Sequence, residues 1–202
     1  MIKVTIADLL KQEQDNEAFP ESYIVALLSE DGHMILPIWI SQGQLEVMAH
    51  TLLGKTANRP LTYTFMANIL KATQVEVESV RIEKIENDTF YAITKLRSGD
   101  QVQEVDARPS DAINLALQTG SPIYVADEVM AQAGIDVSAI SKKPAGRGLT
   151  EIGEAFEAKI NEYQQRLEQR RAEKEQSRSE AQAQEEQRKR QEMVAFIFGE
   201  TE

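Results

Sequence analysis

Apolar residues in the first 140 positions occur in short runs that are typical of β-strands. Two of these runs, residues 22–29 and 33–40, flank the pair Asp31-Gly32. Glycine tolerates the positive φ that a tight turn between antiparallel strands demands. The stretch therefore predicts a β-hairpin.

Three later segments predict an antiparallel meander. Residues 75–85 alternate between apolar and polar side chains with a period of two, as a strand with one buried face does. Residues 89–96 and 101–107 continue this pattern, and short turn sequences rich in Asn, Asp and Gly separate the three runs. We expect neighbouring runs to pair through these turns.

Helical spacing or helix-end signals mark four further segments, which are residues 43–53, 61–73, 109–119 and 127–134. Gly54 is a candidate C-terminal cap of the first, and Pro60 suits the first turn of the second. Pro109 suits the first position of the third, and Gly120 suits the position after its end. Residues 121–125 predict a short strand. Together the elements predict an α+β fold with an antiparallel or mixed sheet and short helices.

The composition changes near residue 145, which divides the chain into two parts. Residues 142–148, KKPAGRG, have the Pro and Gly content of a linker. We therefore expect an α+β domain over residues 1–141 and a charged helical tail over residues 149–202.

The tail predicts a long, coiled-coil-like helix. Large apolar residues between positions 149 and 167 follow heptad spacing, and the polar stretch after them would be held by charge pairs four residues apart. The chain then carries an apolar segment, MVAFIFG, at residues 193–199. This segment either packs on a domain of the protein or docks on a protein partner.

Charge and cysteine content exclude several kinds of site. With 22 basic and 33 acidic residues the net charge is −11, which disfavours non-specific binding of nucleic acid. The chain has no cysteine, so disulfides, thiolate zinc sites and cysteine nucleophiles are excluded. No stretch has the length of a membrane span or of a signal peptide, and we expect a cytoplasmic protein without a membrane partner.

The candidate chemistry lies where a predicted strand meets a predicted helix. The strand ends at Asp106, and the sequence Arg108-Pro109-Ser110-Asp111 begins the helix. A helix start attracts anions, and an arginine can grip a phosphate. Asp106 and Asp111 could together hold Mg²⁺ or Mn²⁺, which would bridge them to a phosphodiester. The alternative is structural, with Ser110 and Asp111 as helix caps and Arg108 paired with an aspartate.

Five motifs along the globular part resemble one known family. They are ILPIWI (35–40), RPLT (59–62), TFYAITKL (89–96), DARPSDAINLAL (106–117) and SPIYVADEV (121–129). Together they resemble the bifunctional nuclease family, whose members are described as cleaving both RNA and DNA. The resemblance covers roughly residues 1–140 and leaves the tail outside. It implies a self-associating domain, so we expect a homo-oligomer that has RNA or DNA as its substrate.

The resemblance carries over to two groups of residues. Asp106, Arg108 and Asp111 are the candidates for catalysis, and the two aspartates are the candidates for binding the divalent metal. The candidates for contacting the substrate are Arg59, Thr62 and Ser110.

The chain departs from the family pattern at several positions, and three of these departures change the chemistry. Gln44 stands where the pattern has Glu, Tyr63 where it has His, and Thr64 where it has Asp. These departures remove two carboxylates and the side chain that titrates near neutral pH. If the family's chemistry needs that set, most of it is lost, whereas chemistry that runs through residues 106–111 survives.

Three functions remain open from the sequence. The first is a nuclease that hydrolyses phosphodiesters of RNA or DNA, with a metal ion lowering the pKa of the attacking water. The second is a catalytically impaired, oligomeric binding or regulatory module of the same fold. The third is an enzyme that uses the same junction for a phosphorylated metabolite.

Overall fold

The computed structural model describes residues 1–13, 21–55 and 57–137, and in the tail residues 165, 169–170, 172–173, 175–185 and 187. The chain divides into two compact units, Met1–Phe156 and Glu157–Glu202. The first unit contains every strand and helix that positions the candidate site. Its fold class is α+β, as the sequence predicts.

One mixed sheet runs through the first unit, with the strand order β6-β5-β4-β7-β1-β2-β3-β8. The strands are β1 (Ile2–Glu13), β2 (Glu21–Ser29), β3 (Met34–Ile40), β4 (Glu76–Glu86), β5 (Thr89–Ser98), β6 (Gln101–Ala107), β7 (Ile123–Val125) and β8 (Ile135–Asp136). Neighbouring strands are antiparallel except for β4 and β7, which are parallel. The parallel pair joins the meander to the hairpin half of the sheet.

The hairpin predicted from the apolar runs around Asp31-Gly32 and the meander predicted from alternation are both confirmed. β2 and β3 pair in antiparallel register, and Gly32 in the turn between them has a φ of 74°. β4, β5 and β6 pair in chain order. The pattern did not reveal β1, which lies between β7 and β2 and carries a register shift between Ile6 and Asp8. A shift of one residue moves side chains to the other face, which breaks the alternation that identifies a strand.

Four helices accompany the sheet: α1 (Gln42–Leu52), α2 (Thr62–Ala72), α3 (Pro109–Thr119) and α4 (Asp127–Ala133). Each matches a predicted segment. Pro60 is the exception among the end signals, because α2 begins at Thr62 with Leu61 as its N-cap. Pro60 therefore precedes the helix instead of lying in its first turn. A proline at this place still stops the preceding chain from continuing as helix.

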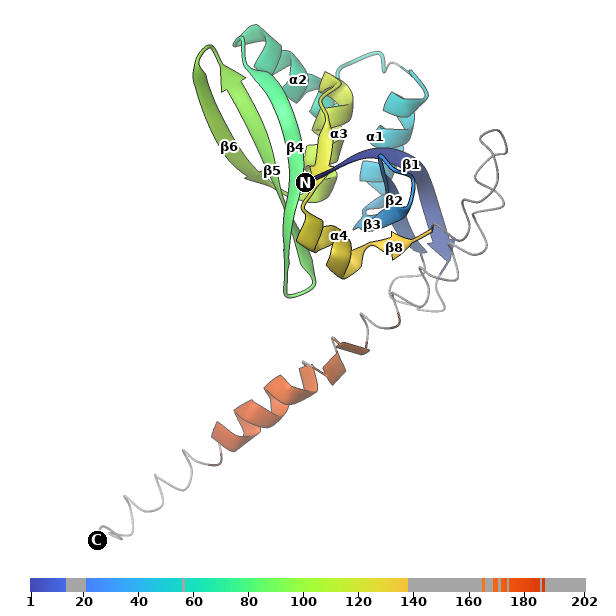
Figure 1. The fold of residues 1–202 in the computed structure, drawn as a ribbon, viewed down its shortest axis with the longest axis vertical. Coiled ribbons are helices and arrows are strands. Elements are labelled where there is room, and N and C mark those ends of the chain that lie inside the picture. The colour runs from blue at the N-terminus through green and yellow to red at the C-terminus, as the bar shows by residue number, and fades with distance from the viewer. Residues whose placement is uncertain are drawn as a thin grey trace, which may run out of the picture. The chain divides into compact units, whose positions relative to one another are not determined.

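α3 is the central helix of the domain, and Figure 1 shows it between the β4–β6 part of the sheet and the β1–β3 part. It contacts both α1 and α2, and seven of its residues are buried. Pro109 occupies the start of the helix, and Gly120 caps its end with a φ of 71°. The first turn of α3 is therefore fixed between the starts of α1 and α2.

The tail predictions fall mostly on residues outside the described part of the chain. The linker at 142–148 and the segment at 193–199 lie outside it, as does nearly all of the heptad stretch. The described tail residues, including 175–185, are helical and exposed. The long C-terminal helix as a whole remains a prediction. Among the described residues no helix has the length and apolar character needed to cross a membrane.

Candidate functional site

Asp111 is the centre of a cluster of side chains contributed by three helices. Its Oδ1 accepts hydrogen bonds from the Tyr63 hydroxyl at 2.5 Å and from the Gln44 amide at 3.0 Å. Its Oδ2 accepts a hydrogen bond from Arg108 Nε at 2.6 Å, which is also an ion pair. We call these four side chains the Asp111 cluster. They bring together residues 44, 63 and 111, which are far apart in the sequence.

Local helix-start geometry places each member of the Asp111 cluster. Gln44 belongs to the capping box of α1, where its Oε1 accepts from the backbone N–H of Ser41 at 3.0 Å. This bond turns the Gln44 Nε2 group toward α3. Tyr63 is the second residue of α2 and is buried, whereas Arg108 is the N-cap of α3 and is exposed. Three helix starts therefore converge on one carboxylate.

Burial and hydrogen bonding act in opposite directions on the Asp111 carboxyl. Burial alone raises its pKa, but the bonds from Arg108, Tyr63 and Gln44 together hold the pKa below its usual value. The ion pair between Arg108 and Asp111 also raises the pKa of Arg108, mainly through the hydrogen bond to Asp111. The carboxylate is therefore ionised and the guanidinium is charged throughout the neutral range.

Tyr63 is a neutral donor in the Asp111 cluster. Burial, followed by the hydrogen bond and the charge of Asp111, raises the pKa of its hydroxyl to about 12. A phenol with this pKa stays protonated near pH 7 and cannot serve as a base there. Its role at neutral pH is to hold Asp111.

Further hydrogen bonds connect the Asp111 cluster to Ser110 and Asn114 of α3. Gln44 Nε2 also donates to the Ser110 hydroxyl at 2.8 Å, and the buried Asn114 donates to the Ser110 carbonyl at 3.0 Å. Ser110 is buried and its hydroxyl accepts this bond from Gln44, while its contact with a substrate stays a prediction. Thr64, the third departure from the family pattern, donates to Gln118 at 3.1 Å and lies outside the cluster.

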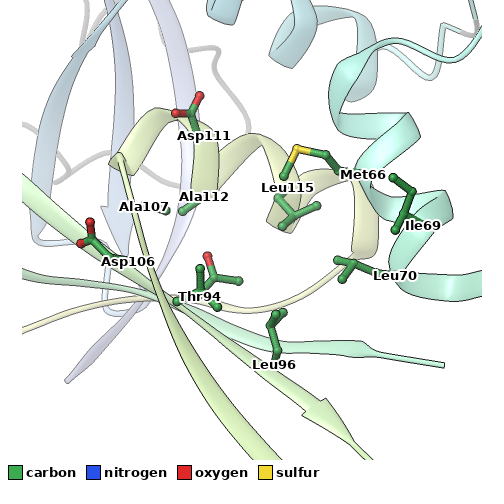
Figure 2. A pocket seen from close by; sticks show the side chains of 11 residues that line it. Met66, Ile69, Leu70, Thr94, Leu96, Asp106, Ala107, Asp111, Ala112 and Leu115 are labelled. Atoms are coloured by element: carbon green, nitrogen blue, oxygen red, sulfur yellow. The ribbon is translucent and has the colours of Figure 1, made fainter. Parts of the chain in front are cut away.

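A pocket of about 280 Å³ lies beside the Asp111 cluster, between α2, α3 and the β5–β6 hairpin. Its aliphatic lining comes from Met66, Ile69, Leu70, Leu96, Val105 and Leu115. Asp106 and Asp111 also line it, and Figure 2 shows both aspartates at one end of the pocket, with Leu70 and Ile69 toward the other. Asp106 is exposed near the end of β6. The pocket is therefore apolar along most of its wall and acidic at one end.

Arg59 and Thr62 are exposed residues at the start of α2. No hydrogen bond or ion pair joins either side chain to another residue that the structure describes. The structure therefore joins Arg108 to Asp111, and joins Gln44 to both Ser110 and Asp111. Arg59 and Thr62 remain exposed at the start of α2.

The residues at the junction do not fit the divalent metal expected between Asp106 and Asp111. Both oxygens of Asp111 already accept hydrogen bonds, and one of them is paired with a cation that would repel a metal ion. In the described part of the chain, no group of three or more His, Cys, Asp or Glu side chains is arranged to hold a metal. Hard cations such as Mg²⁺ need several oxygen ligands. The two oxygens of Asp111 already accept hydrogen bonds and do not serve as such ligands in this arrangement.

A family model matches the part of the chain that contains most of the β2–β3 hairpin, the whole meander and the starts of α1, α2 and α3. A model described as the bifunctional nuclease domain matches residues 25–138. The chain belongs to the bifunctional nuclease domain family. The resemblance seen in the five motifs is confirmed.

Individual members of this family are similar to the chain at modest identity. An uncharacterized protein of Mycobacterium tuberculosis is 38% identical over 117 residues, which are 57% of this chain and 70% of that protein. Bifunctional nuclease 1 of Oryza sativa subsp. indica is 24% identical over 124 residues, 60% of this chain and 38% of that protein. Bifunctional nuclease 2 of Arabidopsis thaliana is 27% identical over 137 residues, 64% of this chain and 42% of that protein. The match therefore spans less than half the length of these plant relatives.

Sequence reasoning missed that Gln44 and Tyr63 are the partners of Asp111. A signal for this contact was present in the sequence. The family pattern has Glu and His at these two positions, whereas this chain has the neutral residues Gln44 and Tyr63. In this member of the bifunctional nuclease domain family, two neutral donors surround the aspartate at those two positions. The structural alternative for Arg108, an ion pair with an aspartate, is also what the structure shows.

Proposed function

We propose that this domain binds a phosphodiester group of RNA or DNA on Arg108 and hydrolyses it. Membership of a family named for its nuclease activity supports this function. The observation that carries it is the orientation of Arg108 by Asp111. A fixed guanidinium beside an open pocket is a device for binding phosphate, whose oxygens match the fork of N–H groups.

Arg108 has N–H groups that are not used by Asp111 and can bind a phosphate. Only its Nε is used by Asp111, and 75% of the side chain is exposed. No described residue accepts a hydrogen bond from the two terminal nitrogens, which leaves them for an anion. Because the ion pair restricts the Arg108 side chain, less conformational freedom is lost when a phosphate binds.

The other candidates take roles that follow from their positions. Asp106, exposed on the rim of the same pocket, is the general base that removes a proton from the attacking water. The water oxygen bonds to phosphorus, the bond to the leaving oxygen breaks, and that oxygen takes a proton from solvent. Asp111 acts by orienting Arg108, and Arg59 and Thr62 are placed to contact the nucleic-acid backbone. The proposed reaction does not use a metal ion on Asp111, because both oxygens of that carboxylate already accept hydrogen bonds.

A second candidate is binding without cleavage, and the contacts of Gln44 and Tyr63 favour it. Two neutral side chains surround Asp111 where the family resemblance leads one to expect a glutamate and a histidine. Neither an amide nor a phenol with a pKa of about 12 exchanges protons near pH 7. In this case Arg108 would hold the nucleic acid and no bond would break.

Hydrolysis of labelled single-stranded RNA and DNA, measured with and without Mg²⁺, separates the two candidates. If the domain cleaves, Asp106→Asn should lower the rate by roughly 10²–10⁴-fold, the usual contribution of a general base. If it only binds, the unaltered protein should retain the oligonucleotide at background cleavage, and the Gln44→Glu, Tyr63→His double variant should gain activity. A protein that neither retains nor cleaves the oligonucleotides would refute both candidates.

A further inference from the structure

The pocket beside the Asp111 cluster contains a hydroxyl group that the cluster does not use. Thr94, on β5, is only 4% exposed and lines the pocket. No described side chain or backbone group forms a hydrogen bond with its hydroxyl, and this oxygen is not among the buried polar atoms that lack a partner, so it is accessible from the pocket. Figure 2 shows this oxygen pointing toward α3, inside the pocket. A hydroxyl held in this way is available to a ligand.

The rest of the pocket defines the shape and polarity of that ligand. The wall is aliphatic, with Leu70 from α2 and Leu96 from β5 among the lining residues, and the volume is about 280 Å³. Pockets for drug-sized ligands measure roughly 300–1,000 Å³, so this one takes a single small group. The group must be largely apolar on its faces and polar at an edge that reaches Thr94.

We propose that this pocket is a subsite for one nucleobase of the bound nucleic acid. Bases have apolar faces that enzymes hold between apolar side chains, and polar edges that form hydrogen bonds. The Thr94 hydroxyl can both donate and accept, so it can bind the edge of any of the four bases. The phosphate contact at Arg108 lies next to Asp111 at the end of the same pocket. A nucleotide would therefore place its base in the pocket and its phosphate on Arg108.

The subsite rests on the proposed function for its phosphate contact, but a pair of ligands separates the two. One is a short thymidine oligonucleotide, and the other has the same length and backbone but hydrogen in place of every base. Both present the same phosphates to Arg108, and only the first can fill the pocket. We expect the first to bind the unaltered protein about tenfold more tightly, because only its bases can bury apolar surface in the pocket and reach the Thr94 hydroxyl.

Two valines of β6 give a matched pair of variants for this test. Val105 lines the pocket and is 45% exposed, whereas Val102 is 42% exposed and does not line it. Val105→Trp should fill the pocket and reduce the affinity ratio of the two ligands to about one. Val102→Trp places the same bulk on the same strand and should leave the ratio unchanged. Because both positions are exposed, neither variant removes core packing.

Thr94→Val tests the hydrogen bond with a side chain of the same shape. It should weaken binding of the thymidine oligonucleotide by roughly 2–10-fold, the value of one net hydrogen bond, and leave binding of the ligand without bases unchanged. Equal affinities of the two ligands for the unaltered protein would overturn the base subsite while leaving phosphate binding intact. A ratio that survives Val105→Trp would also overturn it. Failure of both ligands to bind would instead refute the proposed function on which the subsite rests.

Discussion

At the scale of single residues, the candidate site depends on which groups donate hydrogen bonds to the Asp111 carboxylate. Sequence motifs identified Asp106, Arg108 and Asp111 as candidate catalytic residues, but they could not show that both oxygens of Asp111 accept hydrogen bonds. That outcome depends on Gln44 and Tyr63, which lie 67 and 48 residues away along the chain. Contacts at such separations follow from tertiary packing, which single-sequence patterns do not encode. Asp111 is thereby assigned to orienting Arg108.

Removing the Tyr63 hydroxyl should lower stability, because Asp111 loses a buried, charge-assisted donor. We expect Tyr63→Phe to reduce the free energy of unfolding by about 1–2 kcal/mol at pH 7. Tyr124→Phe is the matched control, since no described residue forms a hydrogen bond with the Tyr124 hydroxyl. Urea denaturation of both variants measures the difference. Equal stability of the two variants would mean that the bond to Asp111 contributes nothing net.

The contribution of Tyr63 should also depend on pH at the alkaline end. Folding raises its pKa from 10.0 to about 12, mainly through burial and then through Asp111. A raised pKa contributes stability that is complete below pH 10 and is lost as pH rises through about 12. The stability difference between the unaltered protein and Tyr63→Phe should therefore shrink between pH 10 and 12. A difference that stays constant over this window would show that folding does not raise the pKa.

At the scale of elements, alternation and helix-end signals predicted most of the strands and all four helices. The failures have physical causes. β1 carries a register shift that disrupts its alternation, and β8 has only two residues, too few for a periodic signal. The parallel pairing of β4 with β7 brings together strands that are separated by the meander and α3, and no local pattern records such a pairing. The start of α3, in contrast, was predicted to the residue because Pro109 marks it.

Two glycines at the ends of elements should respond in opposite ways to substitution by alanine. A Cβ at Gly134 would lie 2.4 Å from the Met130 carbonyl oxygen and 2.8 Å from the methyl carbon of Met34, so the α4–β8 turn would have to shift. We expect Gly134→Ala to lower the free energy of unfolding by about 1–3 kcal/mol. A Cβ at Gly43, in the first turn of α1, meets nothing within 4 Å.

Gly43→Ala should therefore raise stability by about 0.4–1 kcal/mol, since alanine reduces the freedom of the unfolded chain. Thermal denaturation of both variants checks the pair. A Gly134→Ala protein as stable as the unaltered one would contradict the close packing of α4 against β3.

At the scale of the whole molecule, the tail is the part whose role still rests on sequence. The heptad pattern of residues 149–167 predicts assembly, and family resemblance predicts a homo-oligomer. We expect removal of residues 149–202 to reduce the number of chains per oligomer, as calculated from the mass measured by light scattering. The truncated protein should still unfold cooperatively on heating, because every strand and all four helices of the domain end before residue 138. Unchanged stoichiometry after the deletion would argue against an assembling tail.

The central claim is that Arg108, fixed by Asp111, holds a phosphodiester group. The most direct test is binding of a fluorescent single-stranded oligonucleotide, measured by anisotropy at fixed salt for the unaltered protein, Arg108→Gln and Arg97→Gln. The two variants change the net charge equally, and Arg97 lies on β5, paired with Glu78. We expect Arg108→Gln to weaken binding by about tenfold or more, as the loss of a charged hydrogen-bonding contact does, and Arg97→Gln to change it far less. Equal affinity of the two variants would contradict the assignment of Arg108 as the phosphate-binding group.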